Sequence, residues 1–151
     1  MGRIAMSDKR FCRMQGRIFK TASEQGYDME IFSREFLRSS FCAEKLDTEF
    51  SKYQASDVRT SWQEFFPGIE GRLVRSEIPL PHDIARWSGF MYRWIQIETG
   101  IPSAEIYEKL TFQDLFDMYP IYHSVGKPMA SDRLEEEYGL EKVEKTYGSG
   151  G

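Results

Sequence analysis

Apolar residues recur at helical spacing along most of the chain, most clearly in the segment 82–99. At about 100° per residue, its apolar side chains fall in one broad sector, namely Ile84, Trp87, Phe90, Met91, Trp94, Ile95 and Ile97. A narrow polar stripe lies opposite them, made of Arg86, Gly89, Arg93 and Gln96. A helix that is apolar over most of its circumference must be covered on several sides. We therefore predict that 82–99 is the central buried helix of an all-α fold.

Start and stop signals support these bounds. Pro81 stands where a first helical turn tolerates a missing N–H group, and Asp83 places negative charge near the positive helix N-terminus. Gly100 can adopt the left-handed conformation that ends a helix, and Pro102 cannot continue one.

The remaining apolar periods predict shorter helices around the central one. Turn and cap signals place them at 8–25, 28–37, 41–46, 47–54, 58–66, 103–110, 111–119 and 128–138. Pro67 and Pro120 are expected to end two of these helices, and Ser103 and Thr111 to cap two others. The helical period weakens between 68 and 80, so we expect a short extended connector near 72–78.

Length and composition fit one domain. A chain of 151 residues can bury roughly 68–70% of its unfolded surface, so it needs neither a metal nor a disulfide to fold. Hydrophobic residues make up 40% of the chain and aromatic residues 15%, which argues against disorder. We predict a single compact multi-helix domain over residues 1–147, followed by a glycine-rich linker at 148–151.

The sequence disfavours membrane-spanning and secreted proteins. No apolar run reaches the length of a membrane span, and the first residues lack the apolar stretch of a secretory signal. Cys12 and Cys42 lack the spacing of a redox or zinc motif, so we expect free buried thiols. A cytoplasmic protein without a membrane partner is therefore predicted.

Charge is unevenly placed along a chain whose formal net charge is −4. Residues 3–20 are mainly basic, whereas residues 132–145 are mainly acidic. One interpretation is that the two regions lie together in the fold and neutralise each other. The other is that the basic helix at 9–20 contacts nucleic acid, although the segment lacks a helix-turn-helix pattern.

The sequence contains no catalytic or metal-binding motif of recognised specificity. Its two histidines are His82 and His123, and no spacing of acidic or thiol groups supports a metal site. Nucleophile elbows, phosphate-binding glycine loops and kinase motifs do not occur either. We therefore predict that the protein is not an enzyme and uses no cofactor or metal. The alternative is an enzyme in which His123 acts with a carboxylate such as Glu98.

Three polar residues are expected among apolar ones. Gln15 falls in the apolar face of the first helix, Glu98 falls in the apolar sector of the central helix, and His123 follows an aromatic segment. A buried polar group without a hydrogen bond is costly. We predict a structural polar network of Gln15, Glu98 and His123, in which His123 bonds Glu98 or a tyrosine hydroxyl.

The polar stripe of the central helix has two interpretations. It is either a solvated edge with salt bridges inside the domain, or a recognition surface for acidic groups or phosphate, to which arginine offers a planar fork. Tyrosine beside arginine is typical of protein–protein hot spots. The candidate partner-binding residues are Arg86, Gly89, Tyr92, Arg93, Gln96 and Tyr107.

A set of short motifs extends over most of residues 11–135. They are Met14-Gln15-x-Arg17-Ile18-Phe19, Gly26-Tyr27-Asp28, Leu46-Asp47, Gln54, Trp87-Ser88-Gly89-Phe90-Met91-Tyr92-Arg93-Trp94, Thr99-Gly100, Glu105-Ile106-Tyr107 and Tyr119 through His123. In these motifs the chain resembles an uncharacterised family of short helical bacterial proteins encoded beside ADP-ribosyltransferase-like toxins. Ser88 and Pro102 depart from the family pattern. The resemblance implies an antitoxin or accessory component.

Together these observations favour a noncatalytic binding protein that neutralises or masks a cognate partner protein, a toxin or effector. It would act as an antitoxin-like component of a toxin–antitoxin or defence-related module. One alternative is a nucleic-acid-binding regulator that uses the basic N-terminal helix. Another is an inhibitor of a nuclease or other defence enzyme.

Overall fold

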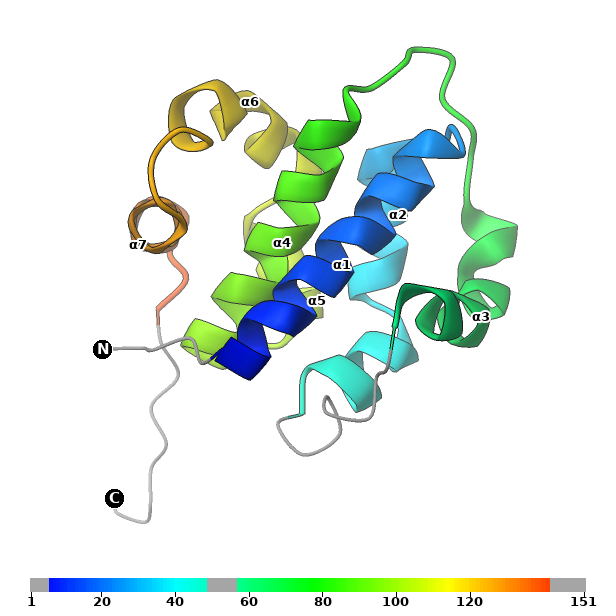
Figure 1. The fold of residues 1–151 in the computed structure, drawn as a ribbon, viewed down its shortest axis with the longest axis horizontal. Coiled ribbons are helices and arrows are strands. Elements are labelled where there is room, and N and C mark those ends of the chain that lie inside the picture. The colour runs from blue at the N-terminus through cyan, green and yellow to red at the C-terminus, as the bar shows by residue number, and fades with distance from the viewer. Residues whose placement is uncertain (1–5, 49–56, 142–151) are drawn as a thin grey trace.

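Two long helices that lie side by side, α1 (Met6–Glu24) and α4 (His82–Thr99), form the centre of the fold (Figure 1). The structure, a computed structural model, describes residues 6–48 and 57–141. Most of the predicted helix at 47–54 and the predicted linker at 148–151 lie outside these residues. Within the described part the chain forms helices and no strands, apart from one isolated bridge. The predicted all-α class and compact helical domain are therefore confirmed.

Shorter helices cover the central pair on several sides (Figure 1). They are α2 (Met29–Leu37), the π-helical turn η1 (Cys42–Leu46), α3 (Val58–Ile69), the 3₁₀ turn η3 (Glu70–Arg72), α5 (Ser103–Lys109), α6 (Phe112–Tyr122) and α7 (Lys127–Glu137). In Figure 1, α3 lies on the α1 side of the pair, and α6 and α7 lie on the α4 side. The pair is thus enclosed, as the apolar circumference of 82–99 predicts.

The central helix α4 is buried as its pattern predicts. Trp87 is 8% exposed and Trp94 is 5% exposed, while Met91 and Ile95 are fully buried. The helix ends at Gly100, which adopts a left-handed φ of 78° and donates its N–H group to the carbonyl of Gln96. This is the predicted stop, because only glycine adopts such a φ at little cost.

Two glycines set how closely α1 and α4 approach. A Cβ atom at Gly89 would lie 2.7 Å from the carbonyl oxygen of Gln15 and 2.7 Å from Cγ of Phe19. A Cβ atom at Gly16 would lie 2.9 Å from the carbonyl oxygen of Arg86. Real Cβ atoms do not approach other atoms so closely, so each helix backbone packs directly on the other only because these side chains are absent.

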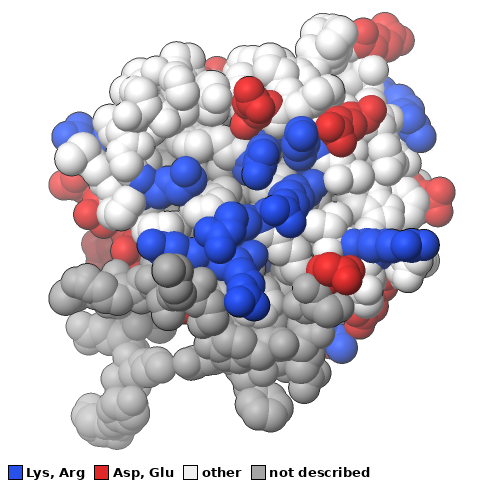
Figure 2. Space-filling model, viewed as in Figure 1, with Lys and Arg blue, Asp and Glu red and all other residues white. Residues whose placement is uncertain are grey.

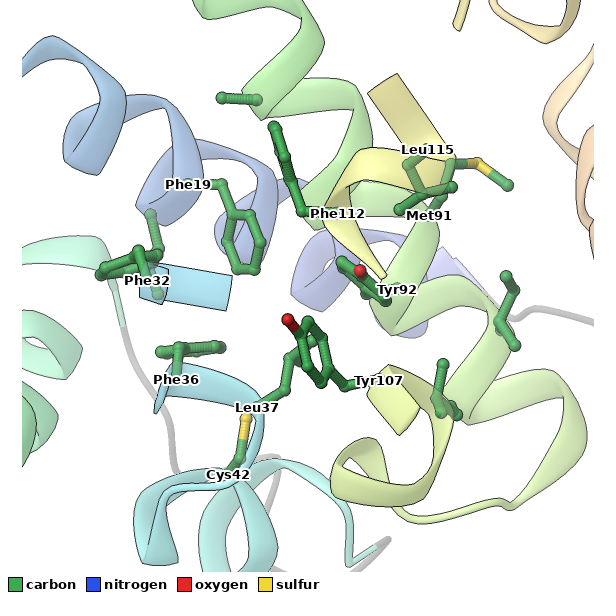
Figure 3. Close-up of a cluster of buried hydrophobic side chains, with 14 of the residues drawn as sticks. Phe19, Phe32, Phe36, Leu37, Cys42, Met91, Tyr92, Tyr107, Phe112 and Leu115 are labelled. Atoms are coloured by element: carbon green, nitrogen blue, oxygen red, sulfur yellow. The ribbon is translucent and has the colours of Figure 1, made fainter. Parts of the chain in front are cut away.

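An aromatic cluster fills the space between the central pair and the helices behind it (Figure 3). Phe19 of α1 makes edge-to-face contacts with Phe32 and Phe36 of α2, at centroid distances of 5.4 and 5.6 Å. Phe36 in turn packs edge-to-face on Phe65 of α3 at 4.9 Å. Such pairs add to the free energy of burial, so α2 and α3 are held to α1 through one shared layer of rings.

Helix ends agree with the sequence at most positions, but both internal prolines are exceptions. The predictions that Pro67 and Pro120 end their helices are wrong, since α3 and α6 include them. Each proline lies in a last turn and is exposed. A carbonyl that loses its N–H partner there can therefore bond water instead.

The caps give a mixed outcome. Thr111 caps α6, and a capping box with Asp114 is complete, because the shorter acid still reaches the backbone N–H of Thr111 at 2.9 Å. The prediction that Ser103 caps α5 is wrong, since Pro102 holds the cap position. The Ser103 hydroxyl instead donates to Asp47 at 2.6 Å.

The predicted extended connector follows η3 and crosses the turn between α1 and α2. Tyr27 and Arg75 form an antiparallel bridge, with the N–H of Asp28 bonding the carbonyl of Val74 and the N–H of Ser76 bonding the carbonyl of Gly26, both at 2.7 Å. The connector is therefore tied to the body of the protein rather than detached from it.

Candidate functional site

The polar stripe predicted on α4 is for the most part an internal surface. Gly89, Arg93 and Gln96 are buried, with Arg93 only 1% exposed, whereas Arg86 is exposed. The expectation of a solvated edge or a contact surface is therefore wrong for these three residues, although the expected salt bridge inside the domain is present between Arg93 and Asp47. The physical reason is that α1 and the η1 region cover the stripe, with Gly89 at the point of closest approach.

All five N–H donors of Arg93 are satisfied inside the protein. Its Nε donates to Oε1 of Gln15 at 2.8 Å, and its Nη1 donates to Asp47 at 2.7 Å and to Gln96 at 3.0 Å. Its Nη2 donates to Sγ of Cys42 at 3.4 Å and to Oγ of Ser103 at 3.1 Å. Burial opposes the charged form, but the neighbouring Cys42 and Asp47 outweigh it, and the pKa of Arg93 is raised.

Asp47 is the counter-charge of this network. Its Oδ1 accepts from Arg93 and from the Ser103 hydroxyl, and its Oδ2 accepts from the backbone N–H of Ser103 at 2.9 Å. Gln15 closes the network by donating from Nε2 to the carbonyl of Gly89 at 3.0 Å. The network thus joins α1, the end of η1, α4 and the start of α5, and the need of Gln15 for partners is met as predicted.

Both candidate tyrosines lie inside the fold, which corrects their assignment to a surface. The Tyr92 hydroxyl donates to the carbonyl of Leu110 at 2.8 Å, and the Tyr107 hydroxyl donates to Glu30. Burial raises the pKa of both hydroxyls, with Glu30 adding to the effect. Glu30 also accepts from the N–H groups of Phe112 and Gln113, so it joins α2 to the start of α6.

His123 does not join the predicted polar network. It is exposed at the end of α6, where its ring stacks on Tyr119 at a centroid distance of 4.3 Å. Its Nδ1 lies 2.6 Å from the carbonyl of Tyr119, and since a carbonyl only accepts, Nδ1 carries the proton. The prediction of a bond to Glu98 or to a tyrosine hydroxyl is wrong, because α6 continues through Pro120 and carries His123 to the surface.

Glu98 finds its partner on α7 instead. The Ser131 hydroxyl lies 2.6 Å from Oε1 of Glu98 and 3.2 Å from Oε2 of Glu135, and the two carboxyl groups are themselves hydrogen-bonded. Burial, followed by the Glu98 carboxyl, raises the pKa of Glu135 to about 9. Glu98, Asp132 and Glu135 have oxygen atoms within 4.8 Å of one another, the one group of described residues that could reach a common cation.

We expect Glu135→Gln to raise the melting temperature at pH 8 to 9 by about 5 °C and to change it little at pH 4. Below its ordinary pKa of 4.5, the carboxyl is protonated in both states. Between pH 4.5 and about 9 only the folded state keeps the proton, so stability falls as pH rises and levels off above that range. A glutamine side chain keeps a hydrogen-bond donor toward Glu98 at every pH, because its amide group does not titrate in this range.

Thermal unfolding followed by circular dichroism from pH 4 to 9.5 measures this difference. The control is Glu136→Gln, an exposed position on the same helix, which should shift the melting temperature equally little at every pH. Parallel curves for wild type and Glu135→Gln would show that the pair does not share a proton.

One face of the molecule carries a cluster of cations, drawn in blue over α1 and α4 in Figure 2, and all of them are exposed except the half-buried Lys20. We call this cluster the basic face and define it as Arg10, Arg13, Arg17, Lys20, Arg59 and Arg86. Four of the six lie on α1 at the spacing of a single helical stripe. The predicted basic helix therefore presents its charges outward, and α3 and α4 add to them.

Most of these cations have no acidic partner among the described residues. Lys20 pairs with Glu24 at 3.6 Å, but none of the five arginines forms an ion pair with a described residue. No described ion pair joins the basic segment near the N-terminus to the acidic residues 132–141 either. The interpretation that these two regions neutralise each other therefore gains no support.

Two hollows adjoin Arg86 on this face. One, of about 370 Å³, is lined by Arg13, Gly16, Asp83, Arg86, Trp87, Phe90 and Lys127. The other, of about 450 Å³, is lined by Arg17, Lys20, Thr21, Glu24, Asp57, Val58, Arg59 and Arg86. Arg86 is therefore the shared member, and the only residue of the predicted stripe that lies in the exposed cluster.

Sequence reasoning missed Arg59 and Lys127, because nothing in the linear pattern brings their segments to α1. The signal available for α1 was its period, which places Arg10, Arg13 and Arg17 together on one side of the helix and Phe11, Met14 and Ile18 together on another.

Comparison with known proteins adds no further constraint. No protein family, curated protein or solved structure matches the chain. The resemblance to proteins encoded beside toxins therefore stays a prediction. None of the described helices combines the length and the apolar character needed to cross a lipid bilayer.

Proposed function

We propose that this protein binds the phosphate backbone of a nucleic acid through the basic face. The observation that carries the proposal is the set of five exposed arginines that no described carboxylate neutralises. The chain as a whole has a net charge of −4, so the clustering is a local feature and not a result of composition. Such a charge distribution attracts a polyanion to one side of the molecule and repels it from the rest.

The arrangement of the charges suits a repeating anion. Arg10, Arg13, Arg17 and Lys20 follow α1 over ten residues, which at a rise of about 1.5 Å per residue is a row of roughly 15 Å. A strand of B-form DNA presents one phosphate about every 3.4 Å along its axis. The row can therefore meet several successive phosphates, and Arg59 and Arg86 beside it can meet others.

The scarcity of exposed apolar side chains on the basic face favours a nucleic acid over an acidic protein as the partner. Protein interfaces have an apolar centre with a polar rim, whereas nucleic-acid interfaces are polar and strongly positive. The large apolar side chains exposed in the described residues are Val74, Ile78, Ile121 and Met129. None belongs to α1, α3 or α4, so the described part of these helices adds no exposed large apolar side chain to the basic face.

Masking of an acidic partner protein at the same face is the second candidate, and it keeps the antitoxin-like role. It is favoured by Arg86, since this residue of the predicted contact stripe is exposed and pairs with no carboxylate in the described part of the chain. Its remaining predicted contacts, Gly89, Tyr92, Arg93, Gln96 and Tyr107, are buried. Such a partner would have to bind mainly through carboxylates.

Fluorescence anisotropy with labelled oligonucleotides tests the proposal. We expect single and double strands to bind, with log Kd rising linearly with log salt at a slope of about 4 for duplex. The triple variant R13Q/R17Q/R86Q should lower that slope by about 3 and weaken binding to all sequences alike. Poly-glutamate with the same total charge as the oligonucleotides serves as the probe for an acidic protein partner.

The matched control is R38Q/K109Q/R133Q, which changes net charge by the same amount at exposed positions, namely the C-cap of α2 and one residue each of α5 and α7. It should keep the slope of the wild type. The basic face is rejected as a nucleic-acid site if neither single nor double strands bind in a salt-sensitive way. It is also rejected if the control variant loses as much affinity as the triple variant. Poly-glutamate that binds more tightly than the strands assigns the face to an acidic protein.

A further inference from the structure

The hollow between α1, α4 and α7 brings together cations from three helices. Arg13 comes from α1, Arg86 from α4 and Lys127 from the first position of α7. Neither arginine has an ion-pair partner among the described residues. Lys127 is exposed, and its Nζ lies 4.8 Å from the centroid of the Phe90 ring, which also lines the hollow.

The start of α7 adds positive potential at the same place. Its N-cap residue Gly126 has no side chain with which to bond the first N–H groups of the helix. Pro128 follows Lys127, so the first turn is short of donors, but the dipole of an 11-residue helix still favours an anion at this end. The charges that face the hollow from α1, α4 and α7 are thus three cations against the single carboxylate of Asp83.

The floor of this hollow distinguishes it from the second one. Its volume of about 370 Å³ exceeds what a phosphate group alone would fill and lies in the range of sites for small organic ligands. Gly16, Trp87 and Phe90 form an apolar floor, against which a charge interaction is stronger than in water. In the second hollow, Lys20 is already paired with Glu24, and Asp57 caps α3 through the N–H of Thr60 at 2.7 Å.

Asp83 narrows the chemistry further. A carboxylate beside a phosphate site repels the phosphate itself but accepts hydrogen bonds from hydroxyl groups attached to it. A sugar phosphate satisfies both requirements, since its phosphate can meet the cations while a ribose hydroxyl donates to Asp83. A terminal phosphate monoester carries about −1.5 to −2 charges at pH 7, against −1 for an internal diester, so three cations favour the monoester.

We propose that this hollow binds the phosphate monoester of a nucleotide, with Arg13, Arg86 and Lys127 on the phosphate and Asp83 on a sugar hydroxyl. The ligand is either the phosphorylated end of a strand or a free nucleoside monophosphate, which share this chemistry. The first source rests on the proposed nucleic-acid binding and adds end recognition to it. The second source is independent of it.

Competition anisotropy on three matched 12-nucleotide single strands tests the proposal, one with a 5′-phosphate, one with a 3′-phosphate and one with hydroxyl groups at both ends. A phosphorylated end should bind on the order of tenfold more tightly, as expected for charge-assisted hydrogen bonds. Lys127→Gln should bring the ratio of the affinities for the phosphorylated and unphosphorylated strands close to one. Lys109→Gln, at an exposed position of α5, should leave this ratio unchanged. Asp83→Asn should remove the advantage of a nucleoside monophosphate over inorganic phosphate as a competitor.

The outcomes separate the two proposals. Strands that bind alike with and without a phosphate, or an end preference that survives Lys127→Gln, overturn the assignment of the hollow and leave the basic face as a nucleic-acid site. Binding of a nucleoside monophosphate that depends on Lys127, without binding of any strand, supports the hollow and rejects the nucleic-acid proposal. Failure of every ligand to bind rejects both.

Discussion

Replacing Arg93 by methionine is expected to lower the free energy of unfolding by about 3–5 kcal/mol, the usual cost of removing one member of a buried ion pair. The substitution leaves Asp47, whose side chain is 11% exposed, without its cation, and the fully buried Gln15 without its donor. For a chain of this size the loss corresponds to a fall in melting temperature of roughly 10 °C or more. Urea unfolding monitored by circular dichroism measures the change.

The geometry of the site predicts that lysine is a poor substitute for Arg93. An ammonium group has three donors on one atom, whereas Arg93 places five donors on three nitrogen atoms toward partners in α1, η1, α4 and α5. We therefore expect Arg93→Lys to lose stability as well, though less than methionine. Arg17→Met, at an exposed position that forms no ion pair with a described residue, is the control and should change stability by less than about 0.5 kcal/mol. An Arg93→Met protein within about 1 kcal/mol of wild type would mean that the network contributes little.

The second large effect is expected at Gly89. A single methyl group there would lie 2.7 Å from the Gln15 carbonyl and 2.7 Å from the Phe19 ring, and neither atom belongs to a flexible chain end. Relief of the clash requires α1 to move away from α4, which loosens the aromatic layer and lengthens the Gln15 bonds. We expect Gly89→Ala to cost about 3 kcal/mol or more, at the upper end for overpacked cores.

The same substitution at Gly68 provides a control, because there alanine is expected to raise the free energy of unfolding instead of lowering it. Gly68 lies in the last turn of α3, and a Cβ atom added there would have no heavy atom within 4 Å beyond its own chain neighbours and helix backbone. Because alanine restricts the unfolded chain more than glycine does, Gly68→Ala should raise stability by about 0.5–1 kcal/mol. Thermal unfolding of both variants and the wild type under one set of conditions measures these two changes in stability. A Gly89→Ala protein as stable as Gly68→Ala would show that the two central helices do not pack as closely as described.

The sequence predicts the helices well because their signals are local. The period of α4, the left-handed stop at Gly100 and the cap at Asp28 all act within a few residues, and each is present. Prolines 67 and 120 misled the prediction of helix ends, since a proline in an exposed last turn costs little. The same error at Pro120 led to the wrong prediction that His123 joins a polar network inside the fold, whereas His123 is exposed at the end of α6.

The orientation of α4 could not be predicted from its period. Arg86 and Arg93 share one helical stripe, yet the first is exposed and the second is buried, because only tertiary packing decides which part of a polar stripe is covered. Two residues held a usable signal. Gly89 in the middle of the stripe indicates close approach of another backbone, and Gln15 on an apolar face needs a polar partner. Matched together, they predict the contact between α1 and α4.

The pairing of α1 with α4 also has a consequence for how the chain is made. Gln15 and Gly89 are 74 positions apart, so α1 leaves the ribosome long before its main partner exists. During that interval its apolar face can be covered only by nearby segments such as α2 and α3. A nascent chain that stops before residue 82 should therefore bind chaperones and resist native folding, and synthesis of the central helix is the step that commits the protein to its final form.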